Sequence, residues 1–197
     1  MNQINQIIGN IDIYLIDQIM KGRYHNSENI LDAGCGGGRN LHWFYNNGFT
    51  IYGIDEKEDH IEVIKKRYPR KVNNFSVSKV EGLIFQNDFF NHILCNAVLH
   101  FAENESHFLK MFSELIRVLK PKGTLFIRVA SNIGLRDKIK HISNGVYNLP
   151  DGSIRFLFTI TLLEKLIESN TFKLLEPLKT VNVNDLRCMT TLVIQKK

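Results

Sequence analysis

The sequence contains few cysteines and no long apolar run. Its 197 residues include three cysteines, Cys35, Cys95 and Cys188, which lie far apart and form no CxxC pair. Because disulfide frameworks and structural zinc sites need clustered cysteines, we expect neither of them and no metal site. No apolar run approaches the roughly 20 residues that cross a bilayer. The segment Met1–Asn10 has neither a basic region nor a cleavage site, so we expect a cytoplasmic protein without a signal peptide or a membrane partner.

Charge of one sign is only slightly in excess. The formal net charge is +5, and part of it lies in the run Lys65–Lys71 at the end of an expected helix, where the negative end of the helix dipole favours cations. We interpret the run as a solvated helix end and do not expect a nucleic-acid partner. Contact with nucleic acid is the alternative, which charge alone cannot establish.

The order of apolar runs predicts a single α/β domain over residues 1–197, a length that suits one compact core. Strands are expected at 29–33, 50–54, 74–78, 92–98, 123–130, 172–179 and 190–195. Helices are expected at 40–47, 59–67, 105–119 and 159–168. Alternating strands and helices are typical of a doubly wound parallel sheet with helices on both faces. The last two strands are too close together for a crossover helix, so we predict a mostly parallel seven-stranded sheet that ends in an antiparallel hairpin.

Two segments fall outside this alternation. Residues 1–27 contain an amphipathic pattern with an apolar stripe at Ile13, Ile16 and Met20, and we expect a helical cap that packs through this stripe. Residues 131–158 are rich in glycine and asparagine, and we expect an irregular insertion that covers the substrate and holds at most one short helix.

The turn after the first strand is the most informative stretch. Gly34, Gly36 and Gly38 follow the acidic Asp32, and such glycines permit a tight turn and a close approach of a ligand to the backbone. The turn ends in Gly38-Arg39-Asn40, which is not the Gly-Lys-Ser/Thr of a P-loop. Position 39 is arginine, so the dinucleotide pattern GxGxxG matches only loosely.

Asp32-Ala33-Gly34-Cys35-Gly36-Gly37-Gly38 resembles the first motif of class I S-adenosylmethionine-dependent methyltransferases. The resemblance extends over roughly residues 28–130 and implies a Rossmann-like methyltransferase fold whose glycine loop contacts the methionine part of S-adenosylmethionine. It implies cofactor contacts from Asp32, Gly34, Cys35, Gly36, Gly38 and Asn40.

The second strand ends in Asp55, about 20 residues after the glycine loop, where an acidic side chain accepts hydrogen bonds from ribose hydroxyls. Nicotinamide enzymes use the same device, and a helix cap is a further alternative. Lys79 stands where the resembling family often has an acidic residue for adenine, and Asn91 replaces another acid before the fourth strand. We therefore expect the backbone of Val80 to meet the adenine. Lys79, Val80, Asn96 and Ala97 complete the predicted cofactor contacts.

Methyl transfer needs mainly alignment of the acceptor, and it needs a general base only if the acceptor must lose a proton. His100 is the candidate base because its unperturbed pKa is near neutrality, and a packing role is the alternative. Tyr14, Arg23, Arg128, Tyr147 and Arg155 are the predicted acceptor contacts. The cations among them favour an anionic acceptor group, with a solvated loop as the alternative.

These patterns predict transfer of a methyl group from S-adenosylmethionine to a small molecule. A nicotinamide-dependent oxidoreductase and a non-catalytic cofactor-binding protein are the alternatives. The oligomeric state is not predicted.

Overall fold

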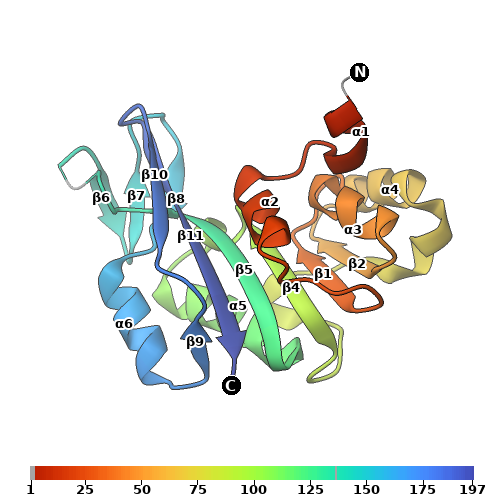
Figure 1. Ribbon diagram of the computed structural model, residues 1–197. Helices are drawn as coiled ribbons and strands as arrows, with labels where there is room; N and C mark the ends of the chain where they lie inside the picture. The colour runs from red at the N-terminus through yellow and green to blue at the C-terminus, as the bar shows by residue number, and fades with distance from the viewer. Residues whose placement is uncertain (1–2, 136) are drawn as a thin grey trace.

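The fold is a mostly parallel sheet with helices on both faces (Figure 1). The computed structural model describes residues 3–135 and 137–197. Five strands run parallel to their neighbours in the order β3-β2-β1-β4-β5. Their bounds are Asn29–Ala33 for β1, Thr50–Asp55 for β2, Phe75–Val77 for β3, Phe90–Asn96 for β4 and Leu119–Ser131 for β5. The doubly wound parallel sheet predicted from the sequence is confirmed.

The sheet closes with antiparallel strands, also as predicted. β11 (Arg187–Lys196) is antiparallel to β5, and β10 (Lys179–Val183) and β9 (Phe172–Leu174) both pair with β11. The single strand predicted over 172–179 is wrong in its middle, so the main sheet has eight strands and not the predicted seven. Pro177 lies in the gap between β9 and β10, and proline has no N–H to donate to a strand ladder.

The helices form two layers. α2, α3 and α4 pack on one face of the sheet, and α5 and α6 pack on the other. The α-helices are Gln3–Ile8 for α1, Ile13–Met20 for α2, His42–Asn46 for α3, Glu58–Arg67 for α4, Glu105–Val118 for α5 and Ile160–Glu168 for α6. Short 3-10 helices are Arg39–Leu41 for η1, Pro69–Asn74 for η2, Val80–Gly82 for η3 and Leu99–Phe101 for η4.

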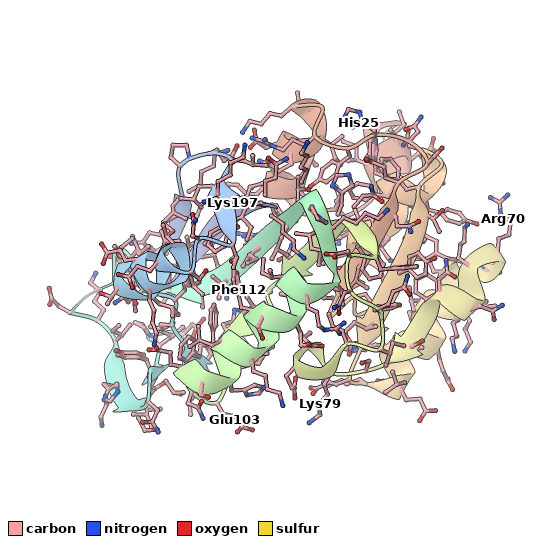
Figure 2. All side chains as sticks on the ribbon, turned by 90° about the horizontal axis from the view of Figure 1, so that it is seen from below. His25, Arg70, Lys79, Glu103, Phe112 and Lys197 are labelled. Carbon is pink, nitrogen blue, oxygen red and sulfur yellow. The ribbon has the colours of Figure 1, made fainter. Side chains whose placement is uncertain are left out.

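Alternation along the strands supplies both cores. Ile30 and Leu94 join the core under α3 and α4, whereas their neighbours Leu31 and Ile93 join the core under α5 and α6. In the second core, Phe112 of α5 contacts Phe172, with ring centroids 5.6 Å apart (Figure 2). Helices after β1 and β2 cover one face and the helix after β4 covers the other, so the winding direction reverses between β1 and β4.

Only Ile16 of the predicted apolar stripe of the N-terminal helix packs against the core, and the other two residues do not. Ile13 is 70% exposed and Met20 is 83% exposed, while Leu15 and Gln18 are buried. The side chain of Asp12 caps α2 and forms an ion pair with β5, and this anchor decides which face of the helix turns inward. Residues 1–2 of the predicted cap lie outside the described residues.

The predicted irregular insertion is a small antiparallel sheet with strands β6 (Lys140–Ser143), β7 (Val146–Asn148) and β8 (Ile154–Phe156). Asn144 and Gly145 join β6 to β7 and have φ angles of 47° and 85°, which suit the two-residue turn of a hairpin. Each strand has at most four residues, so no alternating pattern is visible in the sequence.

No helix in the described part of the chain is long and apolar enough to cross a membrane. The three cysteines are free thiols, each buried in the core.

Candidate active site

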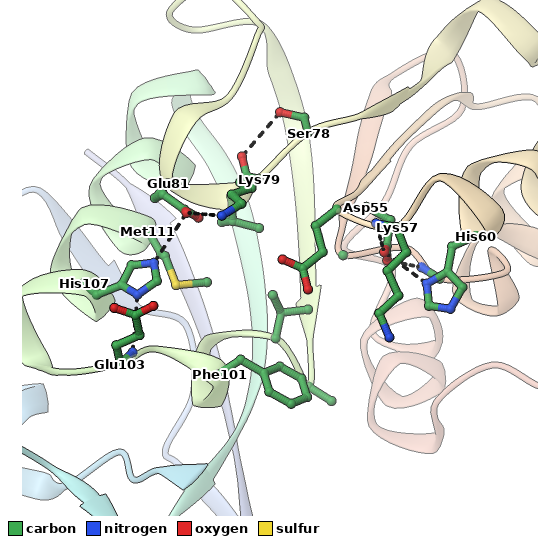
Figure 3. Close-up of a pocket in the computed structure, with 16 residues that line it drawn as sticks. Asp55, Lys57, His60, Ser78, Lys79, Glu81, Phe101, Glu103, His107 and Met111 are labelled. Carbon is green, nitrogen blue, oxygen red and sulfur yellow. Dashed lines mark hydrogen bonds and ion pairs between the residues drawn. The ribbon is translucent and has the colours of Figure 1, made fainter. Parts of the chain in front are cut away.

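A cavity of about 460 Å³ opens at the carboxyl ends of β1, β2 and β4 (Figure 3). It lies where the strand order reverses between β1 and β4, which is where open α/β sheets bind their ligands. The glycine loop and the end of β2 form one wall, and η3, η4 and the start of α5 form the other. The topology therefore places the predicted glycine loop and Asp55 around one cavity.

The glycine loop has left-handed backbone at its three key positions. Gly34, Gly36 and Gly38 have φ angles of 79°, 49° and 74°. A Cβ on Gly34 would lie 2.3 Å from Val98, and one on Gly38 would lie 2.7 Å from Ile64. A Cβ on Gly36 would meet nothing within 4 Å, and Gly36 lines the cavity. Packing therefore requires the outer two glycines, and the middle one faces the space left for a ligand.

Asp32 lies beneath the loop with no partner. It is 1% exposed, and neither carboxylate oxygen accepts a hydrogen bond from any described residue. Burial raises its pKa to about 7, against a smaller opposing effect of Arg39. An unpaired buried charge is costly, so this site favours a ligand that brings positive charge or donors close to Asp32.

Asp55 faces the same cavity and holds its wall together. Its Oδ2 accepts from the backbone N–H of Gly36 at 2.9 Å, and its Oδ1 accepts from the N–H of Lys57 at 3.1 Å. The Nδ1 of His60 lies 3.0 Å from Oδ1 (Figure 3). The carboxylate thus joins the glycine loop to the residue before α4 and borders the cavity, and it does not cap α4.

The far end of the cavity contains an acid that the sequence analysis did not single out. Glu81 in η3 lies 4.0 Å from the Nζ of Lys79 and 3.6 Å from the Nε2 of His107, and all three line the cavity with Val80 (Figure 3). Glu81 lies two residues after Lys79, which stands where the family that the sequence resembles often has an acidic residue for adenine.

The predicted cofactor residues divide into two groups. Six of them line the cavity, namely Gly34, Gly36, Asp55, Lys79, Val80 and Ala97. The others lie behind this lining, namely Asp32, Cys35, Gly38, Asn40 and Asn96. Asn40 accepts a hydrogen bond from the N–H of Asp12 at 3.1 Å, so it anchors the N-terminal segment. Ala97 has a φ of 62°, which is strained for a residue with a Cβ and turns the chain into η4.

The predicted acceptor residues do not all lie together. Arg128 of β5 pairs with Asp12, and its guanidinium carbon lies 4.8 Å from the ring centre of Tyr14. Arg23 is bound elsewhere, to Glu176 at 3.1 Å, in an ion-pair cluster of α2 with the β9–β10 segment. The ion pair neutralises the charge of Arg23, so its predicted contact with the acceptor is not supported.

The insertion brings one predicted acceptor residue to the cavity wall. Arg155 of β8 lies with its guanidinium carbon 4.8 Å from the ring centre of Phe101, which lines the cavity. Tyr147 of β7 packs instead against the small core of the insertion, with Leu149 and Leu157.

His100 follows β4 and is buried beside Phe101, with ring centroids 4.7 Å apart. Its Nδ1 accepts a hydrogen bond from the backbone N–H of Ala130 at 3.2 Å. Burial, with smaller contributions from the cations Arg155 and Arg187, lowers its pKa to about 4. The ring is therefore neutral at pH 7 with its proton on Nε2, and this arrangement opposes the general-base role predicted for it.

Sequence comparison decides the family. The profile of the methyltransferase domain matches residues 31–127, from β1 to β5. The chain belongs to the class I S-adenosylmethionine-dependent methyltransferase family. No group of three or more His, Cys, Asp and Glu residues in 3–135 and 137–197 is arranged to hold a metal ion.

Similar proteins include a ubiquinone biosynthesis O-methyltransferase of Rickettsia bellii, 30% identical over 64% of this chain and 51% of that protein. A tRNA (carboxymethyluridine(34)-5-O)-methyltransferase of Arabidopsis thaliana is 32% identical over 51% of this chain and 23% of that protein. The chain spans about half the length, or less, of these curated relatives.

The fold is also that of a crystallised 1,6-didemethyltoxoflavin-N1-methyltransferase of Burkholderia thailandensis, which holds its substrate and S-adenosylhomocysteine. That structure superposes with a TM-score of 0.71 at 18% identity and covers 99% of this chain and 81% of the other.

The residues at the cavity fit the family's cofactor. S-adenosylmethionine carries a sulfonium and an ammonium group, and the buried carboxylate of Asp32 has no partner among the described residues. Gly36 leaves room on the loop, and Asp55 can accept hydrogen bonds from a ribose. Val80, with Glu81 nearby, would hold the adenine end. The cofactor supplies a methyl group already activated on sulfur.

We expect Asp55→Ala to weaken cofactor binding by about tenfold to several hundredfold, because hydrogen bonds to charged groups are worth roughly 1.5–3 kcal/mol each. The unliganded protein should also lose about 1–2 kcal/mol of stability, because the carboxylate binds the N–H groups of Gly36 and Lys57. Titration calorimetry with S-adenosylhomocysteine and urea unfolding on one sample measure both quantities. A stability loss with unchanged affinity would remove Asp55 from the cofactor contacts.

Proposed function

We propose that this chain transfers the methyl group of S-adenosylmethionine to a small-molecule acceptor. The observation that carries the proposal is the buried carboxylate of Asp32, which has no partner among the described residues and lies under a glycine loop that is open at Gly36. A nicotinamide dinucleotide presents a negatively charged pyrophosphate to such a loop. A carboxylate beneath the loop disfavours that ligand and favours a cationic one.

We propose oxygen as the methylated atom. The Rickettsia and Arabidopsis relatives are both named as O-methyltransferases. We further propose that α2 and the β6–β8 sheet cover the acceptor, since Tyr14 and Arg155 from these elements lie near the carboxyl ends of β4 and β5. Such a cover excludes water and aligns the acceptor with the methyl group.

Calorimetry with S-adenosylhomocysteine and with NAD tests the proposal. We expect one S-adenosylhomocysteine to bind per chain and NAD not to bind at the same concentration. Stoichiometric NAD binding without a response to S-adenosylhomocysteine would establish the oxidoreductase alternative. A protein that binds the cofactor but never converts it in the presence of acceptor candidates would support the non-catalytic alternative.

A nucleic-acid acceptor is the alternative to the small-molecule proposal, and RNA binding by the same protein tests it. Lys65, Lys66, Arg70 and Lys71 have no carboxylate within 4.0 Å in the described ranges, unlike Lys165 and Lys196 elsewhere. The small-molecule proposal expects only weak RNA binding, unchanged by replacing these four cations with glutamine. Tight binding with a steep salt dependence that the replacements abolish would move the acceptor to RNA.

A further inference from the structure

Phe101, on the wall of the cavity, contacts two further side chains, His100 and Arg155. η4 leaves β4 directly beside the cavity, and its last residue, Phe101, is 59% exposed on the cavity wall (Figure 3). The His100 ring meets the Phe101 ring edge to face, and the Arg155 guanidinium lies 4.8 Å from the centre of the Phe101 ring. An aromatic surface is thus flanked by two nitrogen donors.

The hydrogen bond of His100 determines which nitrogen donates. The backbone N–H of Ala130 donates to Nδ1, so Nδ1 must be the unprotonated nitrogen that accepts. The neutral ring must then carry its proton on Nε2. Nε2 has no hydrogen-bond partner among the described residues and is not one of their fully enclosed polar atoms. His100 therefore presents an N–H donor and has no lone pair left for a proton.

Arg155 adds a positive charge next to this donor. No carboxylate lies within 4.0 Å of its guanidinium in the described ranges, and its only protein acceptor there is the carbonyl of Ile154, at 2.6 Å. Arg187 nearby is paired with Asp151 at 3.5 Å. Arg155 is thus an unpaired cation beside Phe101 that can attract an anion to this ring.

We propose that the acceptor binds as an oxygen anion on a planar ring, which rests against Phe101 and is held by the Nε2–H of His100 and the guanidinium of Arg155. This inference rests on the proposed function and names the chemical class of the acceptor, an ionised phenol or an aromatic carboxylate. An oxygen anion forms the new carbon–oxygen bond as the carbon–sulfur bond breaks, and the electron pair goes to sulfur. No proton is released, so the site needs no general base.

4-Nitrophenol tests the assignment, because its phenolate and its neutral form absorb at different wavelengths. The protein saturated with S-adenosylhomocysteine is titrated with this probe across pH. We expect the bound probe to ionise at lower pH than the free probe. Benzoate and benzyl alcohol are the comparison ligands, measured by displacement of 4-nitrophenol. Displacement by benzoate alone would support both kinds of anion, and displacement by neither would restrict the class to phenolates.

Two variants identify the groups that hold the anion. His100→Phe and Arg155→Gln should each weaken phenolate binding about tenfold to hundredfold, the worth of one hydrogen bond to a charge. His100→Gln, whose amide can replace Nε2–H, should restore most of the loss. Arg70→Gln is the matched control, because Arg70 also lies over an aromatic ring, Tyr45 at 5.4 Å, but at the far end of α4 (Figure 2).

The affinity for S-adenosylhomocysteine is measured on every variant. If the wild-type protein does not bind S-adenosylhomocysteine, the proposed function itself is refuted. If S-adenosylhomocysteine binds normally, three results would overturn the anion site alone: binding of the neutral phenol, no binding of the probe, or an equal effect of Arg70→Gln and Arg155→Gln.

Discussion

Gly36→Val should abolish cofactor binding and leave the protein folded. Gly36 lines the cavity, and a side chain built on it meets no protein atom within 4 Å, so the added methyl groups enter the space for the ligand. The φ of 49° strains any residue with a Cβ, at a cost of about 1–2 kcal/mol. We expect S-adenosylhomocysteine affinity to fall by at least about a thousandfold, because a steric block of roughly 4 kcal/mol or more cannot relax in a tight turn.

Gly48→Val is the control for the backbone strain. Gly48 has a φ of 82° and also meets nothing within 4 Å, but it lies at the end of α3 away from the cavity. Thermal unfolding should show a similar loss of stability in both variants, and calorimetry should show lost affinity only in Gly36→Val. Normal cofactor binding by the Gly36 variant would mean that the ligand does not approach the loop at this residue.

The neighbouring glycines would give a different result for a physical reason. A Cβ on Gly34 collides with Val98, and a Cβ on Gly38 collides with Ile64 and Tyr68. Substitution there should destabilise the fold, and any loss of cofactor binding would follow from that. The motif alone does not distinguish a glycine required by packing from one that faces the ligand, since all three occupy equivalent positions in the GxGxG pattern.

The sequence predicted the sheet well because its strands are buried on both faces. Ile30 and Leu31 are both fully buried, and such runs stand out against the polar helices between them. The glycine loop and Asp55 were predictable because the backbone geometry of the turn restricts the residue types. The position of Glu81 was not, because nothing in its local sequence separates a cavity carboxylate from a solvated one.

Long-range contacts explain the errors. Ile13 and Met20 fit a buried stripe by their spacing, but the Asp12–Arg128 pair joins residues far apart in the chain and orients α2 differently. The role of His100 depends on the N–H of Ala130, a contact across 30 residues. The sequence alone suggests a general base wherever a histidine follows a strand. The hydrogen bond from Ala130 of β5 shows that Nδ1 already accepts a hydrogen bond.

Asp32→Asn should stabilise the unliganded protein at pH 8 and weaken cofactor binding. Burial raises the pKa of Asp32 from 3.8 to about 7, so the folded protein holds a proton that the unfolded chain has lost. Wild-type stability therefore falls as the pH rises from about 4 to about 7 and is level above that. The asparagine variant lacks this decline. We expect the two proteins to differ in their pH dependence by about 1–4 kcal/mol between pH 4 and pH 8.

Cofactor binding should show the opposite trend. A cationic ligand favours the ionised carboxylate, so wild-type affinity for S-adenosylmethionine should rise with pH until Asp32 has lost its proton near pH 7. The asparagine variant should lose this rise and bind about tenfold or more weakly at pH 8. Asp185→Asn is the control, since Asp185 is an exposed carboxylate paired with Lys138 and lies outside the cavity lining. Parallel pH profiles of affinity in wild type and Asp32→Asn would mean that the positive charge of the ligand does not interact with the carboxylate of Asp32. Because the unliganded site tolerates that unpaired charge, compensation by the ligand is the physical reason to retain an acid here when asparagine would give a more stable protein.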